Sequence, residues 1–126
     1  MTRGGRPCSV ADAKARLHDA EAFLDTAVTA TDPDVKATNA IHGAIAAADA
    51  ICCIALRERS ADATHVAAVD QLRRVDPKLA ATLSRALNRK TQAAYETRDV
   101  SAGDAAACVG QATSLVAAAR SRVLSL

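Results

Sequence analysis

A chain of 126 residues is long enough for one domain with a single hydrophobic core and too short for two. Half of the residues are hydrophobic but only 2% are aromatic, so the composition favours closely packed helices over a sheet with bulky cross-strand pairs. Sixteen Lys and Arg against fourteen Asp and Glu give a formal net charge of +2, which excludes a global electrostatic argument for nucleic-acid binding.

The N-terminal residues 1–8 form a tail rich in Gly, Arg and Pro, which we expect to be flexible, with a single domain over residues 9–126. The tail is positively charged but lacks the apolar segment of a signal peptide, and we expect no membrane-spanning segment elsewhere. These features predict a cytoplasmic protein with no membrane partner. The first helix is expected to begin after Ser9, an N-cap with Asp12 three positions later, and to end near Ala30.

The stretch from Asp32 to Arg59 is the segment around which we expect the rest of the chain to be arranged. Asp32 is placed to cap a second helix, and Pro33 stands at the first helical position, where its missing N–H costs no hydrogen bond. Read on a helical period, this segment is apolar on nearly every side. Such a helix belongs in the middle of a bundle rather than on its surface.

Three polar residues of the second helix, Asn39, His42 and Asp49, lie along one of its sides. His42 and Asp49 share a face, but two helical turns separate them, which is too far for a direct hydrogen bond along a straight helix. We interpret the three residues as a polar seam at a helix or subunit interface. A catalytic pair of His42 and Asp49 is the alternative.

Three further helices follow. A short one over about 65–75 ends because Asp76-Pro77 repeats the cap-then-proline signal, and a longer one runs to about residue 97. A last amphipathic helix begins at the cap Ser101 and continues almost to the C-terminus. Four long helices, one short helix and short connections predict an all-α antiparallel bundle. Because a core made largely of alanine is thin, we also expect burial against a second copy, as a homodimer.

The four cysteines do not suggest a disulfide framework. Cys52 and Cys53 are neighbours within the second helix, while Cys8 and Cys108 lie near opposite ends of the chain. No C-x-x-C pair is present to hold a metal ion. We therefore interpret all four as small buried hydrophobic residues in a reducing cytosol, and we expect neither a metal nor an organic cofactor.

Basic residues are concentrated in the second half of the chain. Between Arg57 and Arg98 nine basic and five acidic residues give a local excess of four positive charges. A run of this kind is typical of a solvated helix face, and a binding patch is the alternative interpretation.

The order of several local motifs is informative. The small-residue helix Asn39–Ala48 is followed by a helix that opens at Thr64-His65, then by the segment Lys90–Tyr95, and then by a terminal helix led by Val100-Ser101. This succession, over about residues 10–123, resembles the HEPN domain, named for higher eukaryotes and prokaryotes nucleotide-binding. The resemblance implies a helical bundle of the HEPN type.

The resemblance also implies a function. Many HEPN proteins are metal-independent ribonucleases of the toxin–antitoxin or phage-defence kind, with an active motif of an Arg and a His separated by four to six residues. Arg59 and His65, with five residues between them, are the pair that fits. In such a site His65 is the general acid or base and Arg59 holds the phosphate, and two motifs meet across a dimer interface. The resemblance places further substrate contacts at Arg57, Ser60, Lys90 and Tyr95.

Other readings stay open. His65 is alternatively a structural residue that caps and packs at the start of its helix. Because His42-Gly43 replaces the pair of tyrosines common in the family, a second reading is a non-catalytic HEPN module. Such a module would bind a nucleotide or RNA, or pair with a cognate antitoxin or a nucleotidyltransferase. A third reading is a helical interaction module whose polar seam serves only dimerisation.

Overall fold

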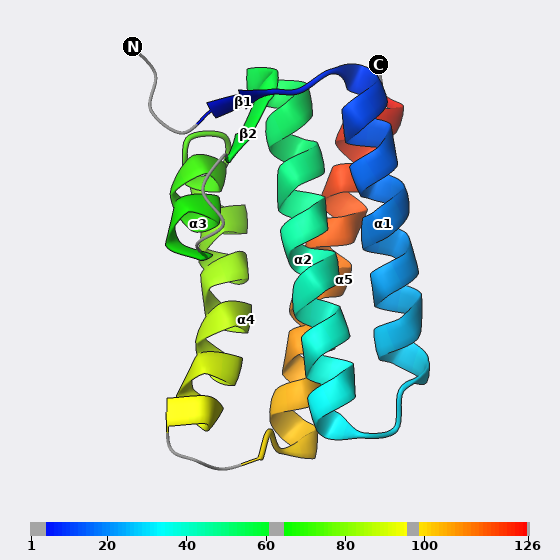
Figure 1. Ribbon diagram of the computed structural model, residues 1–126, viewed down its shortest axis with the longest axis vertical. Coiled ribbons are helices and arrows are strands. Elements are labelled where there is room, and N and C mark those ends of the chain that lie inside the picture. The colour runs from blue at the N-terminus through cyan, green and yellow to red at the C-terminus, as the bar shows by residue number, and fades with distance from the viewer. Residues whose placement is uncertain (1–4, 61–64, 96–98, 126) are drawn as a thin grey trace.

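The computed structural model describes residues 5–60, 65–95 and 99–125 of the chain. The elements in order are β1 (Gly5–Pro7), α1 (Val10–Thr29), α2 (Pro33–Leu56), β2 (Glu58–Ser60), α3 (His65–Arg73), α4 (Pro77–Tyr95) and α5 (Ala102–Leu124) (Figure 1). Four helices of 19 to 24 residues and one of nine residues confirm the predicted all-α fold. Within the described residues the only sheet is the short antiparallel ribbon of β1 and β2.

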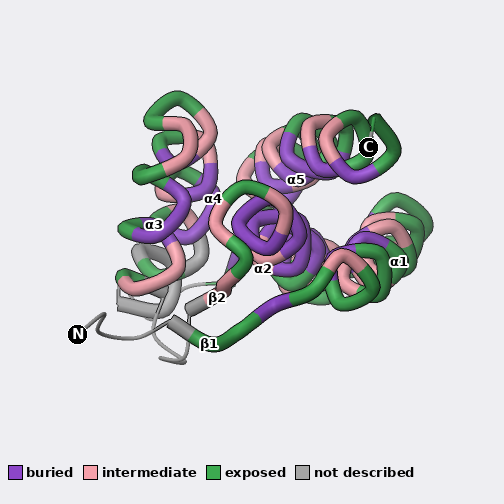
Figure 2. Tube along the Cα trace, turned by 90° about the horizontal axis from the view of Figure 1, so that it is seen from above, coloured by how far each residue is buried: buried purple, intermediate pink, exposed green. Residues whose placement is uncertain are grey.

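The central element is α2. It packs against α1 and α5 along most of its length, and α3 and α4 cover another of its sides (Figure 2). Buried residues are spread over most of its circumference and are mainly alanine, with Ile41, Ile51, Cys52 and Cys53 as the larger side chains. The prediction that this segment lies in the middle of the bundle is confirmed.

Among the described helices, α2 is also the one that is long and apolar enough to cross a membrane by length and composition, with a mean hydropathy of 1.6. However, 61% of its apolar stretch is buried inside the bundle. A helix surrounded by other helices needs an apolar surface on all sides. Packing in the core therefore accounts for its composition.

Side-chain caps start the helices where the sequence predicts. The Ser9 hydroxyl accepts a hydrogen bond from the Asp12 N–H at 3.1 Å, and the Asp12 carboxylate accepts one from the Ser9 N–H at 2.9 Å. The Asp32 carboxylate accepts from the Val35 N–H at 3.0 Å, and Ser101 caps α5 in the same way. These bonds satisfy backbone donors that the first turn of a helix leaves without a partner.

A glycine lets α1 and α2 approach closely. A Cβ atom on Gly43 would lie 3.2 Å from the carbonyl oxygen of Ala20 and 3.4 Å from the backbone nitrogen of Leu24, both in α1. The neighbouring atoms belong to the helix backbone, which cannot move aside as a flexible side chain can. The absence of a side chain at Gly43 therefore sets the α1–α2 separation.

The segment before α1 differs from the flexible tail that the sequence suggests. Gly5–Pro7 forms β1, in which Arg6 pairs with Arg59 of β2. The Cys8 N–H extends this pairing by donating to the Arg57 carbonyl at 2.9 Å. Arg57 itself follows the end of α2 at a φ of 56°, in the left-handed region, and this turns the chain into β2. Residues 1–4 lie outside the described residues.

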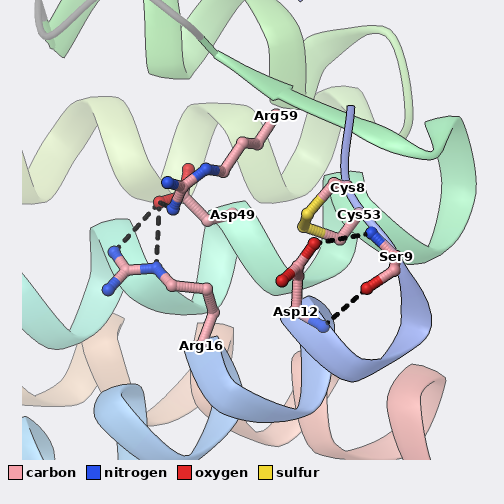
Figure 3. The surroundings of a disulfide bond; sticks show 7 residues. All are labelled: Cys8, Ser9, Asp12, Arg16, Asp49, Cys53 and Arg59. Atoms are coloured by element: carbon pink, nitrogen blue, oxygen red, sulfur yellow. Dashed lines mark hydrogen bonds and ion pairs between the residues drawn. A yellow bond between two sulfur atoms is a disulfide. The ribbon is translucent and has the colours of Figure 1, made fainter. Parts of the chain in front are cut away.

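The prediction that the cysteines form no disulfide is wrong for two of the four. Cys8 is joined to Cys53 by a disulfide that spans 45 residues of sequence, with a Cα–Cα distance of 5.1 Å (Figure 3). The reason is the antiparallel packing of α1 and α2, which places Cys8, two residues before α1, beside the last turn of α2. Cys52 and Cys108 lie outside this bond and are buried, as predicted.

Candidate functional site

Arg59, the predicted phosphate-contacting residue, lies in β2 at the end of the bundle where α1 begins and α2 ends (Figure 1). Its Nη1 atom is 3.9 Å from Oδ2 of Asp49, a residue of α2 (Figure 3). The same oxygen accepts hydrogen bonds from Nε and Nη2 of Arg16 in α1, at 3.2 and 2.9 Å. One carboxylate therefore orients two arginines that come from different elements.

Asp49 is well shielded from solvent, with a side chain that is 16% exposed. Burial raises the pKa of this carboxyl above its usual range, and the charges of Arg16 and Arg59 oppose that rise. The Arg16 guanidinium also donates from Nη1 to Asp19 at 3.1 Å, so it is held on two sides. We infer that Asp49 is a positioning residue for the two guanidinium groups.

An open cavity of about 370 Å³ adjoins this pair. We call it the arginine cavity, and it is lined by Arg6, Pro7, Asp12, Ala15, Arg16 and Arg59. Its walls come from β1, α1 and β2, so no single stretch of sequence builds it. The backbone hydrogen bond from Ser9 lowers the pKa of Asp12, which keeps this carboxylate ionised and turned toward the cap of α1.

The predicted polar seam lies where α2 meets α1. The His42 ring stacks on Phe23 of α1, with ring centroids 5.3 Å apart and an interplanar angle of 28°. Asn39 donates to the Val35 carbonyl at 2.9 Å, and it lines a second hollow of about 390 Å³ together with Phe23 and Arg16. Asp49 is bound to Arg16 rather than to His42. The seam is thus a helix–helix junction within this chain.

Arg59 lies in β2, and His65 stands at the N-terminal end of α3. His65 is the first residue of α3, and its side chain lies outside the described ones. Arg74, just after the end of α3, donates to Glu58 of β2 at 3.1 Å, so the C-terminal end of α3 is the end that adjoins β2. At about 1.5 Å per residue, the start of this nine-residue helix lies roughly 13 Å further along. The Arg59 side chain extends instead toward Asp49 and α1.

The other predicted substrate contacts are dispersed. Arg57 is exposed at the end of α2, and Ser60 ends β2 beside Arg59. Lys90 and Tyr95 belong to the C-terminal part of α4, which runs toward the end of the bundle opposite the β1–β2 ribbon (Figure 1). The side chains of Ser60, Lys90 and Tyr95 lie outside the described ones. Only Arg57 and Ser60 are therefore close in sequence and space to Arg59.

Two residues of the site, Arg6 and Arg16, are not found by sequence reasoning. Arg6 lies in the segment expected to be a tail, and Arg16 belongs to an ordinary amphipathic helix. A signal for Arg16 does exist, because antiparallel packing of the first two helices places it beside the apolar helix that carries Asp49. A carboxylate that is mostly shielded from water on such a helix needs a cationic partner on a neighbouring one.

Among the described residues, no group of three or more His, Cys, Asp or Glu is placed to hold a metal ion. Comparisons of the chain with models of protein families, with curated proteins and with solved structures find no match. Function is therefore inferred from the residues of the site and from the motif order of the sequence.

Proposed function

We propose that this chain is an RNA-directed, HEPN-like protein in which Arg59 contacts a backbone phosphate. The observation that supports this proposal is the pair of arginines, Arg16 and Arg59, oriented by one partly buried carboxylate beside an open cavity. A guanidinium group matches the geometry of a phosphate through paired N–H donors, and it keeps its charge at any physiological pH. The motif order that resembles the HEPN domain favours RNA as the source of that phosphate.

The more specific proposal is a metal-independent endoribonuclease that acts as a homodimer. In the composite site that the HEPN resemblance implies, Arg59 of one copy acts together with His65 of the other. In the reaction, one His65 takes the proton of a 2′-hydroxyl group, and the 2′-oxygen attacks the adjacent phosphorus. The bond to the 5′-oxygen breaks, this oxygen takes a proton from a water molecule, and a 2′,3′-cyclic phosphate forms. Arg59 stabilises the charge that develops on the phosphoryl oxygens.

Expression in a bacterial host tests the proposal. Cells would be induced to make the wild type, Arg59→Ala, His65→Ala or Arg85→Ala, and growth and total RNA integrity would be followed. Arg85 is an exposed arginine of α4 and serves as the matched control. We expect growth arrest with RNA fragmentation for the wild type and the Arg85 variant only.

Equal growth and intact RNA with all four soluble proteins would refute the ribonuclease. Binding of purified protein to RNA or to a nucleotide would then separate the remaining possibilities. Binding that is lost in Arg59→Ala would indicate a non-catalytic module, one that works alone or with an antitoxin or a nucleotidyltransferase partner. Binding that is unchanged in Arg59→Ala would refute the proposed phosphate contact as well.

A further inference from the structure

The β1–β2 ribbon holds two like charges together. Arg6 and Arg59 stand directly opposite each other in the antiparallel register. Opposed residues project from the same face of such a pair, with Cβ atoms about 5 Å apart, and like charges in this position destabilise the pairing. Of the carboxylates in the described part of the chain, Asp49 alone comes within 4.0 Å of Arg59, and it is shared with Arg16. Arg6 and Arg59 therefore place two positive charges side by side at this corner of the molecule.

The arginines of the cavity also retain hydrogen-bond donors. A guanidinium group has five N–H donors, and Arg16 uses three of them, on Asp49 and Asp19. Arg59 is too far from Asp49, at 3.9 Å, for a hydrogen bond. Arg6 is exposed and has no ion pair with any described residue. Three guanidinium groups thus present unused donors to one open cavity.

The two carboxylates near the cavity, Asp12 and Asp49, each accept hydrogen bonds from groups outside Arg6 and Arg59. Asp12 lines the cavity, but its Oδ2 accepts from the Ser9 N–H at the start of α1. Asp49 lies between Arg16 and Arg59 and accepts hydrogen bonds from the Arg16 guanidinium (Figure 3). The apolar lining residues, Pro7 and Ala15, are small and carry no charge. A compact anion with several acceptor oxygens fits these surroundings, and a phosphate or diphosphate group has this chemistry.

The disulfide keeps the Arg6 wall of the cavity in place. β1 has only three residues, and a two-stranded ribbon of this length has little stability of its own. Cys8 directly follows β1 and is bonded to Cys53 in the last turn of α2. This covalent bond holds Arg6 opposite Arg59 despite their repulsion.

We propose that the arginine cavity is a phosphate-binding site that is complete only while the Cys8–Cys53 disulfide is closed. The ligand is a phosphate or diphosphate group, either free or at the end of a nucleotide or an RNA strand. A dithiol reductant opens the site: it supplies two electrons and two protons, the S–S bond breaks, Cys8 and Cys53 become thiols, and the reductant becomes a disulfide. β1 then separates from β2, and Arg6 leaves the cavity.

Titration calorimetry with inorganic pyrophosphate tests the site directly. The oxidised wild type is expected to bind, and Arg6→Gln is expected to bind about tenfold more weakly or worse, because one charge-assisted contact is lost. Arg85→Gln, with the same change of charge on α4, is expected to bind like the wild type. Arg6 is exposed and makes no ion pair with a described residue, so its substitution leaves the fold intact.

Reduction with dithiothreitol is expected to weaken binding by a factor similar to that of Arg6→Gln. Applied to the Arg6→Gln protein, the reductant is expected to cause little further loss, since both changes remove the same contact. A Cys52→Ser protein keeps the disulfide and is expected to retain the response to reductant. Circular dichroism of each sample shows whether the helices persist.

Three results would overturn the proposal: no binding by the oxidised wild type at millimolar pyrophosphate, equal binding by Arg6→Gln, or equal binding by the reduced and oxidised wild type. Should the reduced chain unfold, the Arg6→Gln result with the disulfide closed still decides. Comparison of 5′-phosphorylated with 5′-hydroxyl oligoribonucleotides distinguishes a strand end from a free anion. The site shares Arg59 with the proposed function, but pyrophosphate binding requires neither RNA nor His65. The two proposals can therefore fail separately.

Discussion

The disulfide between Cys8 and Cys53 is expected to make a large contribution to stability. It closes a loop of 45 residues, and the loss of chain entropy in the unfolded state for a loop of that size corresponds to about 4 kcal/mol at 25 °C. Folded domains of this class are stable by only about 5–15 kcal/mol in total. Opening the bond should therefore remove a considerable part of the free energy of unfolding without removing any helix.

Urea unfolding followed by circular dichroism measures this contribution. With a slope of about 2 kcal/mol per molar urea, 4 kcal/mol lowers the midpoint by about 2 M. The oxidised wild type is compared with the reduced wild type and with the Cys8→Ala variant. The reductant is expected to shift the wild type and to leave Cys8→Ala unchanged, because that variant has no disulfide to reduce.

Cys52 and Cys108, which lie outside the disulfide, show which two cysteines form the bond. Burial raises the pKa of the Cys52 thiol to about 12, so its reactive thiolate is scarce at neutral pH. In denaturant without reductant, alkylation followed by mass spectrometry is expected to label Cys52 and Cys108 only. A midpoint that moves by less than about 0.3 M on reduction, or four labelled cysteines before reduction, would refute the reasoning.

Three smaller predictions concern packing, capping and charge. Gly43→Ala is expected to destabilise the protein by about 1–2 kcal/mol, because its Cβ would lie 3.2 Å from a carbonyl oxygen of α1. Gly110→Ala is the control: nothing lies within 4 Å of its Cβ, so it should stabilise α5 by up to about 1 kcal/mol. Thermal unfolding measures both. Asp32→Ala removes the cap of α2 and should cost about 1 kcal/mol, measured by the urea midpoint; no loss would exclude a role for the cap. Burial raises the pKa of the Asp49 carboxyl in the folded protein. Protonation of this carboxyl therefore stabilises the fold at acid pH, and this stabilisation is lost as the pH rises through the pKa of the folded state. Arg16→Gln should raise that pKa further, and the urea midpoint should fall more steeply than in the wild type as the pH rises above about 4; parallel profiles would contradict this.

Much of the fold follows from local signals in the sequence. Ser9, Asp32 and Ser101 cap helices because each places a short side-chain acceptor before an apolar helical pattern. The central position of α2 follows from its apolar circumference, since only a core position buries all sides of a helix. Such signals depend on residues close together in sequence, so they can be recognised before any tertiary contact is known.

The disulfide depends on tertiary structure, although one clue lies in the sequence. The turn between the first two helices is centred near Thr31; Cys8 lies 23 residues before it and Cys53 lies 22 residues after it. In an antiparallel helix pair, residues at equal distances from the turn lie side by side. Position along a hairpin, rather than the spacing of cysteines in the chain, identifies this pair.

The site was harder to predict because its parts come from three elements. Arg59 is recognised by its spacing from His65, but the cavity beside it needs Arg6 from β1 and Arg16 from α1. The three-residue strand that carries Arg6 has no hydrophobic alternation by which a strand is recognised. The position of β1 depends on the disulfide and on the turn at Arg57, and neither can be recognised from the residues next to Arg6 in the sequence.

A mixing experiment on purified chains tests the central claim of a composite RNA-cleaving site most directly. Arg59→Ala and His65→Ala are assayed on labelled single-stranded RNA, first separately and then after they are mixed and allowed to exchange subunits. Each variant alone is expected to be inactive. If half of the dimers are mixed and one of the two sites in each is intact, the mixture should recover about a quarter of wild-type activity and yield 2′,3′-cyclic phosphate ends. Activity in the separate His65→Ala protein, or a wild type that leaves the RNA uncut, would contradict the account.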